Sequence, residues 1–241
     1  QTCALPISVV KHSYLVKSPH DIPRIVEETF FLCSSGRPGP VLIDLPKDIT
    51  SATCNSPLTK VDMDLPGFSV PPIPTEQAIK KFAAAFKGST RPLILAGHGV
   101  LIANAEDELK ALAEKLNAPV TSTVLGKGAF PEDHPHSVGF LGMHGTAYAN
   151  KALVGCDLIF AIGSRWDDRI TPAKIQEFCP EATKLHIDID PAEINKILVP
   201  DETLVGDAKT ILKALLPHIK PLNTKAWLNE IRRNKKKYAL D

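Results

Sequence analysis

Residues 158–169 read LIFAIGSRWDDR, five apolar residues followed at once by glycine and a charged loop. A short apolar run bounded by glycine predicts a buried strand. Residues 92–99, PLILAGHG, repeat the order of apolar run and glycine. We therefore expect strands at 157–162 and 92–96, each followed by a loop in which backbone is accessible to a partner.

The chain around these two runs alternates predicted strands with predicted helices. Further strands are predicted at 119–123, 184–188 and 203–205. Helices are predicted near 76–87, 104–117, 145–154, 172–178, 191–197 and 207–217. Such repeated alternation is typical of a parallel sheet with helices on both faces, so the predicted fold class is α/β, a doubly wound parallel sheet.

A smaller strand-helix-strand segment precedes this domain. Strands are predicted at 9–16 and 41–45, with a helix between them that begins near Ser18 and ends at the run Gly36-Arg37-Pro38-Gly39-Pro40. This order predicts a parallel pair, but two strands and one helix do not bury a core alone. We interpret residues 8–50 as the C-terminal part of a partial α/β domain. The proline-rich residues 51–75 predict a linker, and a charged helix is expected around Trp227.

Bulk composition narrows the function classes. Twenty-eight basic and 27 acidic side chains give a net charge of +1, so no overall field attracts nucleic acid or a membrane surface. The basic run at residues 232–237 is either a nucleic-acid patch or a solvated helix face, and we adopt the second interpretation. Five dispersed cysteines without a C-x-x-C pair indicate neither a disulfide framework nor a zinc site. No apolar run approaches the roughly 20 residues of a membrane span, and we expect a cytoplasmic protein.

The first seven residues are treated separately. Residues 1–7, QTCALPI, can be encoded by the end of a widely used sequencing adapter, and we interpret them as a non-native head. A genuine N-terminal peptide is the alternative.

Function is expected in the loops that follow the strands, because ligands of parallel sheets bind beyond the carboxyl ends of the strands. Gly97-His98-Gly99 either lets backbone approach a ligand or makes a tight turn; its helix is predicted to begin too late for the usual dinucleotide fingerprint. Residues 141–145, LGMHG, either pack internally or line a flat ligand. The loop 163–169 is either a surface ladder of ion pairs or an arginine site for pyrophosphate, with the aspartates holding the arginines.

Two further loops complete this pattern. Asp188 stands at a strand end, where an acidic side chain suits ribose hydroxyls or an adenine amine. Gly206 and Asp207 precede a helix whose N-terminus suits an anion. Five strand ends with polar or glycine-rich loops predict a ligand of dinucleotide size.

Five motifs occur in the chain in this order: KHSYLV at 11–16, SGRPGPVLIDLPKD at 35–48, LGMHGT at 141–146, RWDDR at 165–169 and DIDPAEI at 188–194. Together they resemble one enzyme family, acetolactate (acetohydroxyacid) synthase, and the resemblance covers residues 8–241. Trp166 departs from the family, which usually has Phe there; both are aromatic, so we expect little consequence.

The resemblance implies a thiamin-diphosphate enzyme of three α/β domains whose middle domain binds FAD that takes no net redox part. It implies that 8–50 end the N-terminal pyrimidine-binding domain, 76–218 form the central FAD-binding domain, and 219–241 begin the linker to a C-terminal domain. The implied FAD-site residues are Arg37, Gly97, Gly99, Thr123, Leu125, Leu141, Gly142, Met143, His144, Gly163, Arg165, Asp167, Arg169, Asp188, Ile189, Gly206 and Asp207. The implied substrate-channel residues are Lys47, Met143, Asp168 and Arg169, with Arg169 meeting the carboxylate of the second keto acid.

The implied reaction joins decarboxylated pyruvate to a second pyruvate or to 2-oxobutyrate, on the way to valine, leucine and isoleucine. A homodimer or homotetramer and a small regulatory subunit are the implied partners, without nucleic acid or membrane. The Gly-Asp-Gly motif that binds Mg²⁺ and thiamin diphosphate is not found, since the single Gly-Asp, Gly206-Asp207, precedes Ala208. We therefore expect no metal ligand here and an inactive fragment. The alternatives are the central domain of a related enzyme such as glyoxylate carboligase, or a non-catalytic nucleotide-binding module.

Overall fold

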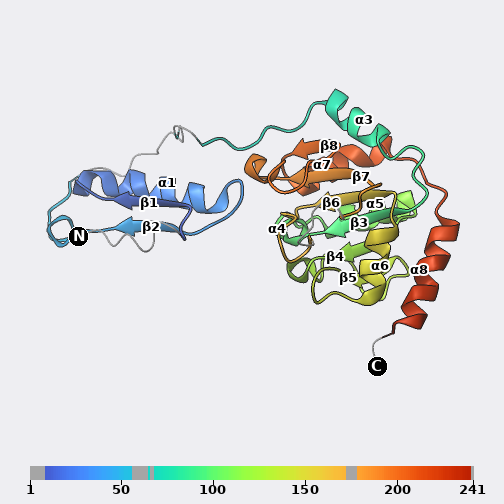
Figure 1. The fold of residues 1–241 in the computed structure, drawn as a ribbon. Coiled ribbons are helices and arrows are strands. Elements are labelled where there is room, and N and C mark those ends of the chain that lie inside the picture. The colour runs from blue at the N-terminus through green and yellow to red at the C-terminus, as the bar shows by residue number, and fades with distance from the viewer. Residues whose placement is uncertain (1–8, 56–64, 66–67, 172–177, 240–241) are drawn as a thin grey trace. The chain divides into compact units, whose positions relative to one another are not determined.

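A strand-helix-strand unit forms the N-terminal part of the chain in the computed structural model, which describes residues 9–55, 65, 68–171 and 178–239. The chain divides into two units, Gln1–Val70 and Pro71–Asp241, and each is described by itself. The head and the helix predicted at 172–178 fall outside the described residues, except for Phe178. In the first unit the elements are β1 (His12–Leu15), η2 (Pro19–Asp21), α1 (Ile22–Ser34), β2 (Val41–Asp44) and α2 (Lys47–Thr50) (Figure 1).

The two strands of the first unit pair in parallel, with His12 opposite Val41, which confirms the predicted pairing. The Lys11 ammonium donates to the carbonyls of Leu32 and Ser35, both at 2.6 Å. It thereby provides hydrogen-bond donors for carbonyl groups at the C-terminal end of α1. The described core cluster of this unit contains three buried apolar side chains, Val16, Ile25 and Ile49, and Leu32 is buried apart from it. A helix residue, Phe30, remains 70% exposed.

This small core sets an expectation for hydrogen exchange. Because little apolar surface is buried beneath β1 and β2, their amides should open and exchange faster than those of the buried strand at 158–162. Hydrogen exchange followed by mass spectrometry measures both sets of amides in one sample. Equal protection of the two sets would show that the first unit is stabilised by more than its described core.

The second unit contains a six-stranded parallel sheet, which confirms the predicted fold class. Its strands are β3 (Pro92–Ala96), β4 (Val120–Ser122), β5 (Ser137–Phe140), β6 (Leu158–Ile162), β7 (Thr183–Asp188) and β8 (Glu202–Val205). Their order in the sheet is β5-β4-β3-β6-β7-β8, with every neighbouring pair parallel. Its helices are α3 (Glu76–Ala84), α4 (His98–Ile102), α5 (Glu106–Leu116), α6 (Ala147–Gly155), α7 (Ala208–Leu215) and α8 (Lys225–Lys237), with short turns η3 (Val124–Gly126), η5 (Pro191–Glu193) and η6 (Leu216–His218).

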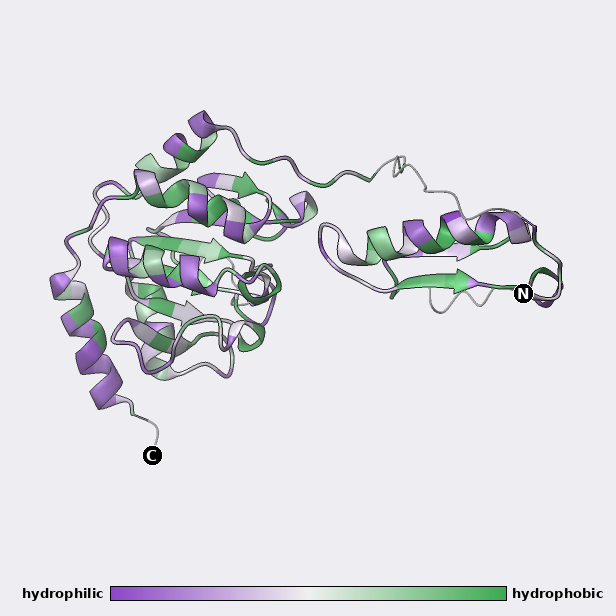
Figure 2. Cartoon of the chain, turned by 180° about the vertical axis from the view of Figure 1, so that it is seen from behind, coloured by the Kyte–Doolittle hydropathy of each residue, from purple (hydrophilic) through white to green (hydrophobic). Residues whose placement is uncertain are grey.

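Alternate side chains of the central strands supply two separate cores. Ile94 and Phe160 lie in the core beneath α3, α5 and α7. Leu93 and Ile159 lie in the core beneath α6 and α8 on the other face. Figure 2 shows the matching pattern, with hydrophobic strands inside and hydrophilic helix surfaces outside. Covered on both faces, the sheet leaves its strand ends as the positions where loops meet solvent.

Three expectations about local structure were wrong. The helix after Gly97 does not begin late, because α4 starts at His98. A strand absent from the predictions, β5, directly precedes the loop 141–145. The helix predicted at 191–197 is limited to η5, since Ile194 is extended and Asn195 has a left-handed backbone with φ +62°.

The C-terminal helix α8 lies against the second core. Trp227 is buried, and its indole Nε1 donates to the carbonyl of Pro92 at 2.9 Å. The Lys235 ammonium donates to the carbonyl of Ser137 at 2.9 Å. The basic run is therefore divided: Arg232, Arg233 and Lys236 stay exposed, whereas Lys235 fastens the helix to the sheet.

Asp157 joins the segment before β3 to β6. Its carboxylate accepts hydrogen bonds from Ser89 Oγ at 2.5 Å, from the Thr90 amide and hydroxyl at 2.9 and 3.0 Å, and from the Arg91 amide at 3.0 Å. Partial burial raises the pKa of this carboxyl, but the hydrogen bonds from Ser89, Thr90 and Arg91 outweigh burial and lower it below 3.8. A carboxyl whose pKa is lower in the folded than in the unfolded chain stabilises the fold. This stability is fully present above the pKa of the unfolded chain, and it is lost as pH falls through the pKa of the folded chain.

Asp157→Asn should therefore lower the free energy of unfolding near pH 7 by about 1–2 kcal/mol. This figure is the usual contribution of hydrogen bonds to a charged group, reduced because solvent screens a partly exposed carboxylate. Urea denaturation at pH 7 and at pH 3 measures the difference between variant and wild type. The difference should be smaller at pH 3, because the stability that a lowered folded-state pKa gives declines once pH falls below the unfolded-state pKa. An equal difference at both pH values would contradict the assigned role of the charge.

Candidate functional site at the carboxyl edge of the sheet

The strand order places a topological switch point between β3 and β6. From β3 the chain proceeds to β4 and β5, and from β6 it proceeds to β7 and β8 on the other side. The connections after β3 and β6 therefore diverge at the carboxyl edge, which is where α/β sheets bind their ligands. In Figure 1 α4 lies at this edge of the sheet.

Three predicted glycines pack directly against one another at this switch point. The Gly97 amide donates to Ile162 O at 2.9 Å, and the Gly99 amide donates to Gly163 O at 3.1 Å. A β-carbon on Gly97 would overlap the Gly163 carbonyl, and one on Gly99 would lie 2.6 Å from Gly163 Cα. Glycine is thus required here by packing between the two loops, whereas the sequence suggested either approach of a ligand or a tight turn.

The loop after β6 presents one arginine between two buried side chains. Ser164 and Trp166 are 3% and 2% exposed, whereas the Arg165 side chain is 49% exposed. Arg165 Nη2 lies 2.9 Å from Asp167 Oδ2, and Asp167 Oδ1 accepts the amide of Arg169 at 3.2 Å. The first aspartate therefore holds Arg165, a contact that fits both a ladder of ion pairs and an arginine site for pyrophosphate.

The second acidic residue of the loop is placed differently. Asp168 Oδ1 lies 3.9 Å from Arg169 Nε, and both side chains are largely exposed. An exposed pair at this distance contributes little to stability. Asp168 and Arg169 are consequently accessible to a partner in solution.

Trp166 has an unusual backbone conformation within this loop. Its φ of +54° lies in the left-handed region, which costs a residue with a side chain about 1–2 kcal/mol. Its ring packs on Phe178 and His186, with centroids 5.5 and 5.4 Å away. Among the described residues, Trp166 Nε1 and Ser164 Oγ are buried polar atoms that have no hydrogen-bond partner.

The loop 141–145 is joined to the arginine loop. The Met143 amide donates to Arg169 O at 3.1 Å, and a β-carbon on Gly142, whose φ is +117°, would lie 2.5 Å from the same oxygen. The Asn150 side chain bonds both the amide and the carbonyl of Gly142 at 3.1 Å. Leu141 is buried, whereas Met143 and His144 are exposed. Two predicted substrate-channel residues, Met143 and Arg169, are therefore brought together.

The loop after β4 adds apolar surface at the same edge. Thr123 Oγ1 accepts the Gly126 amide at 2.9 Å and starts the turn η3. Val124 and Leu125 are 60% and 64% exposed, close to the 67% exposure of Met143. Leu125 is one of the predicted site residues; its exposed neighbour Val124, which was not among them, lies in the same strand-end loop.

The loops after β7 and β8 have their own internal bonds. Asp188 is buried, and its Oδ1 accepts the Asp190 amide at 2.9 Å, while Ile189 is half-buried. The Gly206 amide donates to Asp188 O at 2.9 Å. Asp207 Oδ1 accepts the Thr210 amide at 2.8 Å and caps α7. Asp188 and Asp207 therefore have structural roles beside any contact with a ligand.

The remaining predicted residues, Arg37 and Lys47, belong to the first unit and are exposed there.

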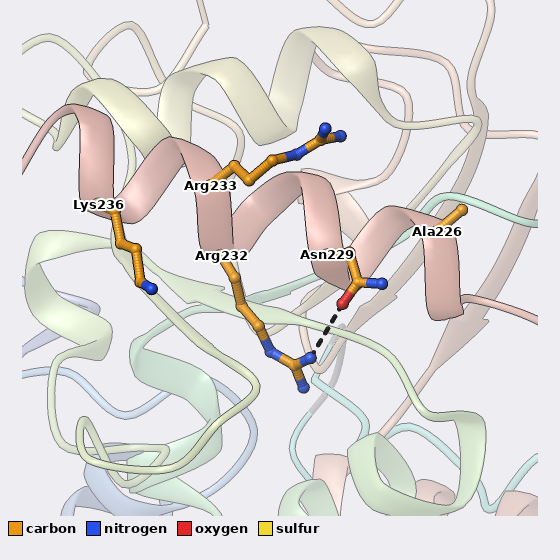
Figure 3. Close-up of a pocket in the computed structure, with 5 residues that line it drawn as sticks. All are labelled: Ala226, Asn229, Arg232, Arg233 and Lys236. Atoms are coloured by element: carbon orange, nitrogen blue, oxygen red, sulfur yellow. Dashed lines mark hydrogen bonds between the residues drawn. The ribbon is translucent and has the colours of Figure 1, made fainter.

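A surface depression lies along α8, and its lining contains none of the predicted site residues. Figure 3 shows Arg232 and Lys236 on one side of this helix and Arg233 directed away from them, with Arg232 Nη1 3.1 Å from Asn229 Oδ1.

In the part of the chain that the structure describes, no set of three or more His, Cys, Asp and Glu side chains has an arrangement that could hold a metal ion. Within the same residues, every helix falls short of the length and apolar character needed to cross a bilayer.

The fold and the switch-point loops define a class that sequence comparison identifies. Residues 79–215 match the model of the thiamine pyrophosphate enzyme central domain, and the chain belongs to this family. More particularly, it is 45% identical over 233 residues to the probable acetolactate synthase large subunit of Methanocaldococcus jannaschii, covering 95% of the chain and 39% of that protein. It is 41% identical over 255 residues to the acetolactate synthase large subunit of Cyanidium caldarium, covering 98% and 42%.

A third relative agrees with these two. The acetolactate synthase large subunit of Buchnera aphidicola subsp. Schlechtendalia chinensis is 45% identical over 212 residues, covering 88% of the chain and 37% of that protein. The chain thus spans about two fifths of the length of these relatives.

Proposed function

We propose that this chain is the central part of an acetolactate synthase large subunit and that it binds FAD at the carboxyl edge of its six-stranded sheet. The observation that carries the proposal is the identity of 45% to a probable acetolactate synthase large subunit across 95% of the chain. The proposed reaction condenses two pyruvates to 2-acetolactate, or pyruvate with 2-oxobutyrate. Thiamin diphosphate and Mg²⁺ are proposed for the complete enzyme.

The chemistry of the strand-end loops fits a flavin dinucleotide. Val124, Leu125 and Met143 supply exposed apolar side chains, which suit a flat ring. Arg165 supplies a half-exposed guanidinium, which suits pyrophosphate oxygens. The unpartnered Ser164 Oγ and Trp166 Nε1 flank this arginine, and a buried polar atom without a partner still has hydrogen-bonding capacity to satisfy.

Each loop then has a proposed task. Arg165 holds the pyrophosphate, and Asp167 keeps the guanidinium in place. Met143 lies against the ring, while Arg169, joined to Met143 through its carbonyl, extends toward the carboxylate of the second keto acid. FAD takes no net redox part in the proposed reaction, so these residues bind and orient rather than transfer electrons.

The proposal is tested by expressing the chain together with its flanking reading frame and assaying acetolactate formation from pyruvate. Activity that requires FAD, thiamin diphosphate and Mg²⁺ together is the expected result. Glyoxylate is the control substrate, because preference for glyoxylate would assign the chain to a carboligase of that kind. The 241-residue chain alone should form no acetolactate above the buffer background.

A further inference from the structure

A buried histidine connects the arginine loop to the neighbouring strand. His186 lies on β7 opposite Ala161 of β6, and its side chain is only 4% exposed. Its Nε2 is 2.8 Å from the carbonyl oxygen of Ser164. Because a carbonyl only accepts hydrogen bonds, Nε2 carries the proton and donates it.

The histidine contacts the loop on both sides of Arg165. The Ser164 carbonyl precedes Arg165 in the chain, and the Trp166 ring, packed 5.4 Å from the imidazole, follows it. Since both flanking side chains are buried, Arg165 is the residue that the loop turns outward. The strained backbone of Trp166, with φ +54°, is held by this packing.

The surroundings keep the imidazole neutral. Burial lowers the pKa of His186 to about 4, against the partial opposition of the Ser164 carbonyl and the Glu193 charge. Asp188 Oδ2 also faces the ring, at 3.7 Å, which exceeds hydrogen-bond distance. A neutral imidazole has one N–H, and here that N–H is donated to Ser164.

We propose that His186 is the positioning residue of the flavin site: by binding Ser164 O and supporting Trp166, it fixes the backbone from which Arg165 reaches the ligand. This inference rests on the proposed FAD site. His186 itself acts through Arg165 and needs no contact with the flavin.

The test is a double-mutant cycle measured by FAD titration of the 241-residue chain. His186→Phe keeps a ring and removes the donor, and it should weaken FAD binding about 5- to 10-fold. His186→Gln retains an N–H at similar reach and should stay within about 2-fold of wild type. In an Arg165→Ala background, His186→Phe should cause no further loss, because residues that act through one another are not additive. A further 5- to 10-fold loss would overturn the proposal.

Controls separate positioning from general destabilisation. His136→Phe makes the same exchange before β5, away from the arginine loop, and should leave FAD affinity unchanged. Urea midpoints show which variants are folded; if His186→Phe is unfolded, His186→Asn, whose amide is too short to reach Ser164 O, replaces it in the cycle.

A second readout does not depend on the flavin. Without FAD, the amides of residues 163–169 should exchange about tenfold or more faster in His186→Phe than in wild type, while those of β3 stay unchanged. Wild-type protein that fails to bind FAD would refute the proposed function alone. Unchanged exchange of 163–169 would refute the role of His186.

Discussion

Gly97→Ala should strongly destabilise the second unit. The added β-carbon would overlap the Gly163 carbonyl, and both partners are backbone held by hydrogen bonds at the ends of adjacent central strands. Gly97 itself has φ −95°, so the expected loss is steric and involves no left-handed strain. We expect a destabilisation of about 4 kcal/mol or more, a large share of the roughly 5–15 kcal/mol that stabilises a domain.

Gly128→Ala is the matched control for this substitution. Gly128 has φ +93°, and a β-carbon there would meet no atom within 4 Å. Its replacement should cost only the backbone term, about 1–2 kcal/mol. Urea denaturation followed by circular dichroism compares the two variants. Equal midpoints for Gly97→Ala and Gly128→Ala would mean that the two loops can separate without loss of the sheet.

Arg165→Ala should weaken FAD binding about tenfold to a hundredfold, because losing hydrogen bonds to a charged partner costs roughly 1.5–3 kcal/mol. The side chain has half of its surface free for a ligand, and its one described ion pair, with Asp167, is within its own loop. Removing it should therefore leave the fold intact. Flavin titration measures the affinity, and circular dichroism verifies the fold.

Arg169→Ala is the control in the same loop. This side chain is 73% exposed, and the resemblance assigns it to the keto-acid carboxylate. In the complete enzyme it should impair pyruvate use more than flavin retention. Unchanged FAD affinity in Arg165→Ala would remove the flavin from this loop, whatever the effect of Arg169→Ala.

Local sequence patterns predicted those elements that have strong local signals. The strand β3 was predicted residue for residue, because PLILA is a continuous apolar run closed by glycine. The strand β5 was missed, since its sequence SVGF contains a glycine and two of its four residues are only half-buried. The helix α4 was missed because it has five residues and begins after Gly97, which offers no side-chain cap.

The sheet order and the contacts between loops could not be predicted from such patterns. The rule that ligands bind beyond strand ends located the loops correctly as neighbours of one edge. The contacts of Gly97 with Gly163, of Met143 with Arg169 and of His186 with Ser164 depend on which strands are adjacent. Residues 22 to 66 positions apart in the chain meet in these contacts, and no local period encodes them.

The most direct test of a flavin site at the carboxyl edge is titration of the 241-residue chain with FAD, followed by flavin fluorescence. Binding by the strand-end loops predicts a saturable change that ends at one FAD per chain. Flavin emission that rises in proportion to added FAD throughout the titration would contradict the account.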